Sequence, residues 1–243
     1  TQEMIVAPIP IYGRLPLVKL TIQRLQDQGA HVIGIGHAKE AKDMVLSMGA
    51  EWVEHSNDPL GAKWNAGFKA ARKHNPSGVI FMGSSDWCSD NYIETCELLL
   101  DEYDLLGKLG CHFIDVAEDI RLVNWHGYGT GPRSYEPIGI GRVLSDRFLN
   151  KLNWQPFDQR LSSGLDWSMW LKAIHADAAV GILEDPDLML MSISTSAWSN
   201  KHKFNDHWTG PLKSDRITDL STIYKTFPQI TELHETMLDI TKP

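Results

Sequence analysis

One acidic residue stands at the mouth of an apolar, strand-like run. Asp86 lies in the stretch Gly78–Glu94, which reads GVIFMGSSDWCSDNYIE. An aspartate at a strand end is often a turn or helix cap. It also offers the carboxylate oxygen that hard divalent cations prefer, and an ion such as Mg²⁺ is commonly held by one or two carboxylates plus substrate phosphates. Two interpretations follow: a turn residue beside a core Trp87, or a metal ligand with Trp87 against a bound molecule.

A second acid stands at an expected helix start. Asp166 belongs to the segment Gly164–Trp170, which reads GLDWSMW. A carboxylate in the first turn complements the helix dipole, which is one explanation of its position. The alternative is a general base held in place by that helix. Trp167 and Trp170 fall on one helix face, and an indole suits either a protein core or the face of a sugar.

Two basic side chains also allow either a structural or a ligand-binding role. Lys63 and its neighbour Asn65 lie near the start of an expected helix, and this lysine is either solvated or directed at a diphosphate. His202 lies in a polar tail, where a lone histidine is a surface residue, a core residue or a metal ligand.

Strand-like and helix-like segments alternate over about the first hundred residues. One apolar helical face is formed by Leu60, Trp64, Phe68 and Ala71. The fourth expected helix covers residues 89–106. This alternation predicts an α/β fold with a mostly parallel sheet covered by helices on both faces. In such sheets ligands bind at the carboxyl ends of the strands.

The second half is expected to be less regular. A hairpin is predicted over residues 110–125, a Gly-, Pro- and Tyr-rich loop over 126–142, and one or two strands over 178–194. Helices are predicted at 144–152, 162–176 and, in the tail, near 217–227. No linker or repeat interrupts the chain, so we expect one domain over 1–243. Within it we expect two sub-regions, 1–107 and 108–195, and a tail (196–243) that is a candidate lid, as is the loop Gly127–Arg142.

Composition narrows the class of protein. The 243 residues carry a formal net charge of −8, with no basic block, which disfavours a nucleic-acid partner. The three cysteines show no metal or disulfide spacing, which is typical of reduced thiols in a cytoplasmic protein. No run reaches the ~18 apolar residues of a membrane span, and the first residues lack the pattern of a signal peptide. The sequence indicates no oligomeric state.

The ordered segments PIYGR, PLGAKWNAGF, FMGSSDW, EPIGIGR and GLDW resemble family-2-like glycosyltransferases with the GT-A fold. The resemblance covers roughly residues 4 to 205 and is closest to small phage, large-virus and bacterial members with a Ser-Ser-Asp or Ser-Asp-Asp metal motif. It implies a nucleotide-sugar donor, of which a UDP-sugar is favoured, and a divalent metal, Mn²⁺ or Mg²⁺. It also implies an acceptor hydroxyl on a glycan or another molecule.

The resemblance also implies residue roles. Asp86 is the metal-binding acid, and Asp166 is the base of an inverting transfer. The chain departs from the family where Ser84 or Ser85 replaces the first acid of the metal motif and Leu165 replaces a glutamate. The expected nucleotide-sugar contacts are Pro8, Tyr12, Arg14, His37, Lys63, Asn65, Ser84, Ser85 and Arg142. His202 is a second expected metal ligand, and Trp87, Trp125 and Trp167 are expected acceptor or sugar contacts.

Other functions remain open at this stage. A nucleotidyltransferase shares the fold and the metal, but it normally carries a Gly-rich basic loop after the first strand, where this chain has APIPIYGR. A non-enzymatic sugar-binding module would suit the nine tryptophans. A nucleic-acid acceptor is a narrower variant that the negative charge disfavours.

Overall fold

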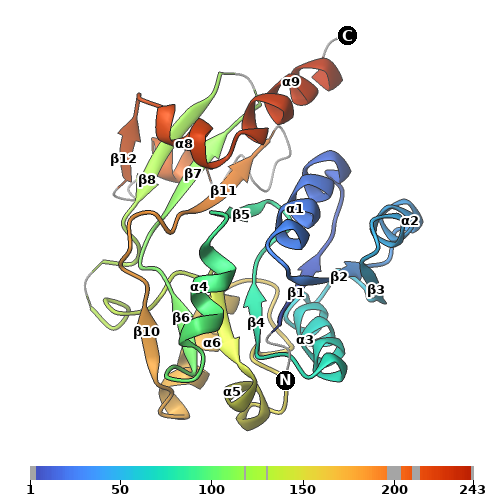
Figure 1. Ribbon diagram of the computed structural model, residues 1–243, viewed down its shortest axis with the longest axis vertical. Helices are drawn as coiled ribbons and strands as arrows, with labels where there is room; N and C mark the ends of the chain where they lie inside the picture. The colour runs from blue at the N-terminus through green and yellow to red at the C-terminus, as the bar shows by residue number, and fades with distance from the viewer. Residues whose placement is uncertain (1–3, 118, 130, 196–203, 210–213, 242–243) are drawn as a thin grey trace.

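The computed structural model describes residues 4–117, 119–129, 131–195, 204–209 and 214–241, with side chains up to residue 237. Its first part alternates strand and helix, as the sequence predicts (Figure 1). The elements are β1 Ile5–Pro10, α1 Leu15–Asp27, β2 His31–Gly36, α2 Lys39–Ser47, β3 Glu51–Glu54, α3 Leu60–Ala71, the 3₁₀ turn η1 Arg72–His74 and β4 Gly78–Phe81.

The second part mixes short strands and helices. Its elements are β5 Asp86–Cys88, α4 Tyr92–Leu99, β6 Leu105–Gly107, β7 Cys111–Asp115, β8 Arg121–Trp125, β9 Arg142–Ser145, α5 Asp146–Lys151, α6 Leu165–His175, β10 Val180–Ile182, β11 Leu190–Ser194, β12 Ser214–Ile217, α8 Ser221–Thr226 and α9 Gln229–Thr241. The antiparallel pairing of β7 with β8 confirms the predicted hairpin.

The larger sheet has seven strands in the order β10-β6-β9-β4-β1-β2-β3. Strands β4, β1, β2 and β3 pair in parallel, and so do β10 and β6, whereas β9 runs antiparallel between β4 and β6. This is the mostly parallel α/β sheet that the sequence predicts. Its carboxyl edge therefore collects the segments that follow β1, β2, β3 and β4.

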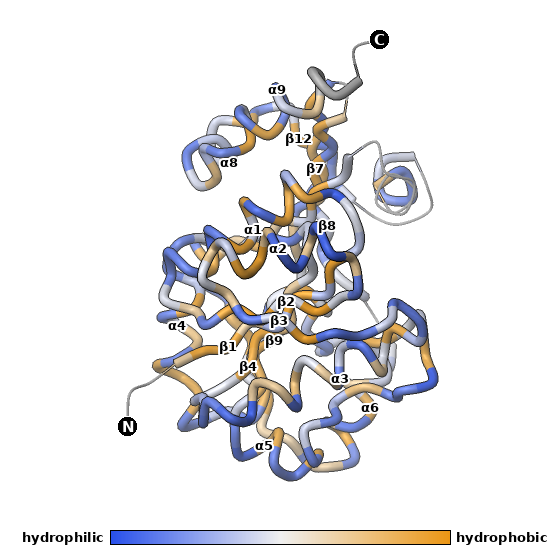
Figure 2. Tube along the Cα trace, turned by 90° about the vertical axis from the view of Figure 1, so that its right-hand side faces the viewer, coloured by the Kyte–Doolittle hydropathy of each residue, from blue (hydrophilic) through white to orange (hydrophobic). Residues whose placement is uncertain are grey.

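The alternation of side chains along β1 explains the layers. Ile5, Ala7 and Ile9 pack in one buried cluster with residues of α1, α2 and α4, whereas Val6 packs in another with residues of α3, α5 and α6. Because successive side chains of a strand point to opposite faces, one strand serves both layers. Figure 2 shows the central strands between α4 on one side and α3 and α6 on the other.

A second sheet of five strands has the order β12-β8-β7-β11-β5. Its apolar face packs against α8 and α9 through Ile223, Phe227 and Ile230. In Figure 1 these two helices cover this sheet at the end of the molecule away from β10 and α5. None of the three cysteines forms a disulfide. Within the described residues, no helix combines the length and apolarity that crossing a membrane requires.

Three elements differ from the sequence-based expectation. Helix α4 ends at Leu99 instead of continuing to residue 106, because residues 105–107 form β6 and pair with β9 and β10. Strand β9 occupies residues expected to begin a helix, and the tail carries α9 as well as the predicted α8. Short apolar runs fit the helical period and the strand period equally well. Whether such a run becomes a helix or a strand therefore depends on the strands that it can pair with.

Candidate active site

A pocket of about 590 Å³ opens between the two sheets at the carboxyl edge of the larger one. Asp86, at the start of β5, and Asp166, in the first turn of α6, both line it. The residues around them come from the end of β4, the start of α3, the middle of β7, the end of β8 and the loop before β9. Two carboxylates that are 80 residues apart in sequence therefore share one cavity.

The carboxylate of Asp86 closes a tight turn and faces the pocket. Its Oδ2 accepts a hydrogen bond from the Gly83 N–H (3.0 Å), and its own N–H donates to the Gly83 carbonyl (3.1 Å). A side chain at position 83 would meet Asp86 Oδ2 at 2.6 Å, so a larger residue here would displace the Asp86 carboxylate. No hydrogen bond from the described residues reaches the other carboxylate oxygen, Oδ1. Asp86 is thus a turn residue that also has an oxygen to offer.

Arg14 lies close to this carboxylate. Its Nη2 donates to Ser84 Oγ (3.4 Å), and its Nη1 is buried without a hydrogen-bond partner among the described residues. Burial lowers the pKa of Arg14, and the charge of Asp86 opposes that shift. A buried guanidinium nitrogen that lacks an acceptor suits an anion such as a phosphate. A carboxylate oxygen beside such a donor fits a divalent cation with substrate phosphates completing its ligands.

Asp166 is held ionised by its neighbours. Its Oδ2 accepts hydrogen bonds from the Tyr128 hydroxyl and from Arg133 Nη2 (3.1 Å). Burial alone raises the pKa of this carboxyl, but the Tyr128 hydrogen bond and the nearby Arg142 and Arg133 guanidinium groups outweigh burial and bring the pKa below its ordinary value. Burial raises the pKa of the Tyr128 phenol, and the contact with the Asp166 carboxylate raises it further. Asp166 therefore stays a proton acceptor at neutral pH.

The loop before β9 fixes the first turn of α6. Arg142 is fully buried and donates from Nη1 to the Asp166 backbone carbonyl (2.7 Å). Its Nη2 pairs with the buried Glu136 carboxylate (2.7 Å). A side chain at Gly139 would meet Asp166 Cβ at 3.0 Å, which limits that position to glycine or to a shifted loop. The loop and the helix thus position Asp166 together.

Aromatic rings form the pocket walls. Trp64 lies edge-on to Phe81 (4.5 Å between centroids), and Trp125 lies edge-on to Tyr128 (5.1 Å). From the tail, the His207 ring stacks on Phe113 at 4.0 Å. Amphipathic rings around a few polar groups are typical of sites for sugars and nucleotides.

Three polar residues predicted to contact the nucleotide-sugar are instead part of the interior. Lys63 is 1% exposed, and its Nζ donates to the Ile11 carbonyl (2.8 Å) and to Asn57 Oδ1 (2.7 Å). Asn65 bonds both backbone groups of Phe157 (2.9 and 3.1 Å). The polar atoms of Arg142 are likewise directed at carbonyls and Glu136, and none of the three residues lines the pocket.

Two further residues that the sequence analysis expects at the site are buried. Pro8 is buried within β1, where a side chain at Gly67 would meet its Cβ at 2.7 Å. Trp87 is 1% exposed, and its Nε1 donates to Thr21 Oγ1 (2.9 Å) while its ring packs near Phe227. Neither side chain lines the pocket, because each is packed in the protein interior.

The remaining predicted residues are divided. Trp125 lines the pocket, whereas the half-buried Trp167 lies outside its lining and under the Arg133 guanidinium (5.1 Å). Tyr12 (75% exposed) and the exposed His37 follow β1 and β2 at the same sheet edge. Ser84 and Ser85 are buried in the turn before Asp86, and the Ser85 carbonyl accepts from the Ile193 N–H. His202 lies outside the described residues.

Several pocket residues were missed from the sequence. Trp64 lies on the predicted apolar helix face and was interpreted as core, although one side of it meets the pocket. Tyr128 and Arg133 lie in the loop that was predicted as a lid, and the Tyr-rich composition of that loop was their only signal. Asp206 and His207 lie in the tail, where no periodic pattern distinguishes them.

Neither a protein-family model nor a curated protein matches the chain. Solved structures do match. S. aureus TarS 1-349 has a TM-score of 0.56 and 14% identity over 79% of this chain and 60% of that chain. The mannosyltransferase PcManGT from Pyrobaculum calidifontis, in complex with GDP-Man and Mn²⁺, has a TM-score of 0.53 and 10% identity over 83% of this chain and 59% of that chain.

The inositol-1-phosphate CTP transferase from T. maritima has a TM-score of 0.52 and 13% identity, and the match covers 94% of this chain and 97% of that chain. At these identities the likeness shows the fold, which is the GT-A fold of nucleotide-diphospho-sugar transferases. The chain spans about 60% of the length of TarS 1-349 and of the mannosyltransferase. The same fold serves sugar transfer in one neighbour and nucleotidyl transfer in another.

Proposed function

We propose that this protein is a metal-dependent glycosyltransferase that moves a sugar from a nucleotide-diphosphate donor to an acceptor hydroxyl. The observation that carries the proposal is the shared pocket of Asp86 and Asp166 at the ligand-binding edge of a GT-A sheet. A neighbour of this fold binds GDP-Man and Mn²⁺, which supports a nucleotide-sugar and a divalent ion as ligands.

Asp166 acts as the general base of this reaction. The Tyr128 hydroxyl already donates to Asp166 Oδ2, so an O–H group in the pocket reaches this carboxylate. An acceptor hydroxyl in the same place gives up its proton to Asp166 as its oxygen bonds to the anomeric carbon. The bond from that carbon to the donor phosphate breaks on the opposite face, and one displacement inverts the configuration. Such assistance contributes about 10²–10⁴-fold to the rate.

Asp86 and Arg14 receive the departing diphosphate. Asp86 Oδ1 would hold a divalent ion, Mn²⁺ or Mg²⁺, which supplies charge neutralisation for the leaving group. The buried Nη1 of Arg14 offers a hydrogen bond to a phosphate oxygen on the same side. The exposed Tyr12 and His37 follow β1 and β2 at this sheet edge, and the nucleoside would extend toward them.

The chain divides into functional regions on this proposal. Residues 1–107 bind the nucleotide, residues 108–195 supply the base and the acceptor surface, and the tail from 196 closes over the donor. The tail residues Asp206 and His207 line the pocket, which supports this role, whereas α8 and α9 pack against the second sheet. The loop 127–142 contributes Tyr128 and Arg133 and acts as the second closing segment.

The test is release of nucleoside diphosphate from a panel of UDP-, GDP- and dTDP-sugars with Mn²⁺, with and without hydroxyl acceptors. We expect one donor to be consumed, and we expect Asp166→Asn to lower turnover about 10²–10⁴-fold while its unfolding midpoint stays near that of the wild type. Asp101→Asn, an exposed aspartate away from the pocket, is the matched control. Equal rates in Asp166→Asn and wild type would remove Asp166 from the base role.

Nucleotidyl transfer is the second candidate, because the CTP transferase match covers nearly the whole of both chains. That reaction joins a nucleoside triphosphate to a sugar phosphate and releases pyrophosphate. The products separate the two functions: nucleoside diphosphate from a nucleotide-sugar supports the glycosyltransferase, and pyrophosphate from a nucleoside triphosphate supports the alternative.

A further inference from the structure

Two histidines and a glutamate meet at the edge of the larger sheet opposite the pocket. His31 is the first residue of β2, Glu51 is the first residue of β3, and His74 ends η1, which follows α3. We call this set the His-Glu cluster. Parallel pairing places Ile33 beside Glu51, so His31 lies on the same face of its strand two residues earlier. The cluster joins three elements that are distant in the sequence.

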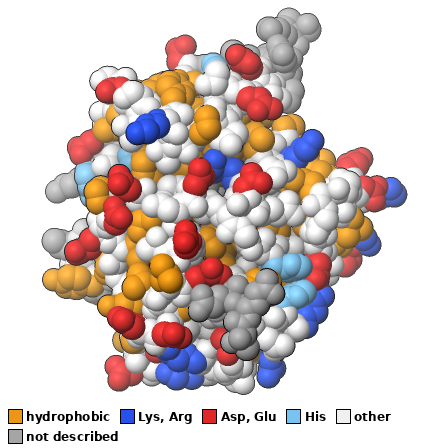
Figure 3. Space-filling model, in the orientation of Figure 1, with side chains coloured by type: hydrophobic (Ala, Val, Ile, Leu, Met, Phe, Trp, Pro, Cys, Tyr) orange, Lys and Arg blue, Asp and Glu red, His pale blue; other side chains and the backbone are white. Residues whose placement is uncertain are grey.

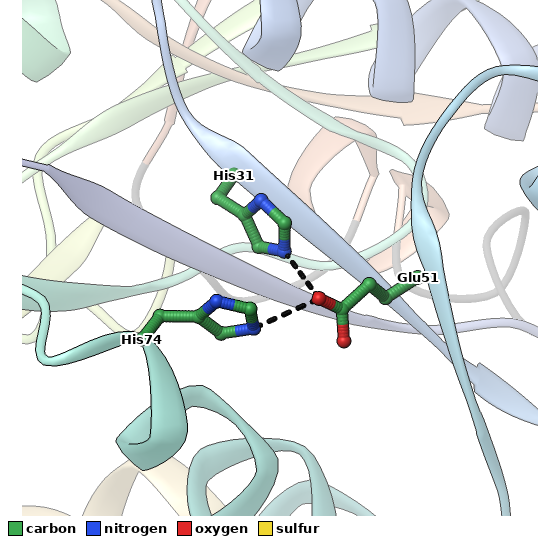
Figure 4. Close-up of side chains that lie close together, drawn as sticks. All are labelled: His31, Glu51 and His74. Carbon is green, nitrogen blue, oxygen red and sulfur yellow. Dashed lines mark hydrogen bonds and ion pairs between the residues drawn. The ribbon is translucent and has the colours of Figure 1, made fainter.

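The two imidazoles face one carboxylate oxygen. His31 Nε2 lies 3.1 Å and His74 Nε2 lies 2.9 Å from Glu51 Oε1, and the ring centroids are 4.2 Å apart. Figure 4 shows both rings directed at this oxygen. One ligand atom from each residue lies within 4.8 Å of the other two. With metal–ligand bonds of about 2.0–2.2 Å, the ligand atoms of a tetrahedral zinc site lie about 3.3–3.6 Å apart. The separations of 3.1 and 2.9 Å between the ring nitrogens and Glu51 Oε1 are a few tenths of an ångström shorter than that.

Hydrogen bonding alone does not satisfy the cluster. His74 Nε2 is buried, and despite its nearness to Glu51 it makes no aligned hydrogen bond with any described residue. The second oxygen, Glu51 Oε2, accepts from Lys73 Nζ at 2.5 Å, which orients the carboxylate and leaves Oε1 for the two rings. Outer contacts of this kind orient metal ligands in many proteins.

We propose that His31, Glu51 and His74 form a binding site for a zinc-type transition metal ion, separate from the pocket of Asp86. Two imidazoles and one carboxylate are a ligand set that Zn²⁺ accepts, with the fourth position left to water. All three side chains are partly exposed, at 29%, 31% and 20%, so an ion can enter from solvent. The ion would link β2, β3 and the end of α3 at the amino edge of the sheet.

The ligand chemistry separates this site from the catalytic one. Imidazole ligands favour Zn²⁺ over Mn²⁺ and Mg²⁺, whereas a carboxylate with phosphates favours the latter two. Figure 3 shows acidic side chains spread among apolar and basic ones on one face of the molecule, so net charge alone gives no focused cation site there.

The experiment is a calorimetric titration of ZnCl₂ into tag-free protein that has been stripped with a chelator and dialysed. We expect one ion per chain at this site, and we expect His74→Gln to weaken its binding by about 100-fold or more, since even an outer partner of a metal ligand is worth about 10–100-fold. His175→Gln, an exposed histidine at the end of α6, is the matched control and keeps wild-type affinity. Asp86→Ala is included to remove the pocket ion, and it too keeps the zinc.

A second variant guards against misfolding. Glu51→Gln keeps the size of the side chain, and both variants are compared with wild type by thermal unfolding in chelator before any zinc is added. Zinc raises the unfolding temperature of the wild type and of His175→Gln but not of His74→Gln or Glu51→Gln. Failure of folded wild type to bind zinc, or equal zinc affinity in wild type and His74→Gln, would overturn the proposal and leave only a cluster of charges around Glu51.

Discussion

Two sets of polar residues lie near the same edge of the larger sheet, and they have opposite surroundings. Asp86 and Asp166 direct carboxylate oxygens into the pocket, where their protein partners are few and polar. Lys63, Asn65 and Arg142 lie behind them with their donors bonded to backbone carbonyls, a neighbouring amide and a buried carboxylate. The first set faces a ligand space, and the second set holds the loops that shape that space.

The difference teaches that the residue type and the sheet edge together do not define a ligand contact. A buried charge must be paired or hydrogen-bonded, so the donors of a lysine or arginine near a site are often already bonded to acceptors in the surrounding loops. The comparison makes a direct prediction: variants of the second set lose stability, and variants of the first set lose binding or turnover.

Arg142→Met should have the largest effect on stability. The change removes one of the two arginines that pair with the buried Glu136 and leaves the Asp166 carbonyl without its donor, which costs up to about 3–5 kcal/mol. Urea unfolding measures it. The control is Arg160→Met, because Arg160 pairs with Asp158 on the surface and its removal should change little. Equal unfolding midpoints in the two variants would show that Arg142 is not an anchor.

Lys63 should make stability depend on pH. Burial lowers the pKa of Lys63 from 10.5 to about 8, so between these values the unfolded chain binds a proton that the folded chain has released. Below pH 8 the folded chain bears the full free-energy cost of burying the charged Lys63. This cost disappears as the pH rises from 8 to 10.5, so the free energy of unfolding increases by about 3 kcal/mol over this range.

The measurement is the free energy of unfolding at several pH values between 7.5 and 10.5 for wild type and Lys63→Met. Subtracting the two curves removes the titration of other groups. A rising difference in favour of the wild type supports the buried lysine, and a flat difference would place Lys63 in solvent or against a ligand.

Asn65→Ala should cost less. The variant removes both hydrogen bonds to Phe157, and the buried Phe157 N–H is left unsatisfied, at about 1–3 kcal/mol. Nucleotide affinity should remain within twofold of wild type when measured well below the unfolding temperature. Weaker nucleotide binding with unchanged stability would restore the ligand role that the resemblance implies.

The two tryptophans give the smallest effect. Trp87→Phe loses the hydrogen bond to Thr21, worth about 1 kcal/mol of stability, and leaves binding unchanged. Trp125→Phe keeps an aromatic wall but alters the pocket surface, so its effect should fall on the KM for acceptor or donor. Reversal of this pattern, with Trp87 affecting KM, would contradict the assignment of Trp87 to the core.

Local patterns were enough to predict the alternating strands and helices, the hairpin of β7 and β8 and the positions of Asp86 and Asp166. Each depends on a short periodicity or on a residue at the end of an element. The fate of Lys63 depends on the Ile11 carbonyl and on Asn57 in another loop, and that of Arg142 depends on Glu136 and the start of α6. Acceptors that come from distant segments of the chain cannot be identified from the sequence around the donor.

The pocket walls show the same limit. Trp64 was visible as part of an apolar helix face, but only the packed structure places one side of that face against open space. Trp87 looked like a site residue because it follows Asp86, yet adjacent residues of a strand point to opposite faces. That alternation, applied to β5, separates the ligand-facing Asp86 from the core-facing Trp87.

The most direct test of the account is a calorimetric titration of UDP, GDP, dTDP and CMP into the wild type, Asp86→Ala and Asp166→Asn, with Mn²⁺ and then with EDTA. The account predicts that one nucleotide binds in the presence of Mn²⁺, that binding is lost with EDTA and in Asp86→Ala, and that it persists in Asp166→Asn. Binding that survives both EDTA and Asp86→Ala, or no binding of any nucleotide to the wild type, would contradict it.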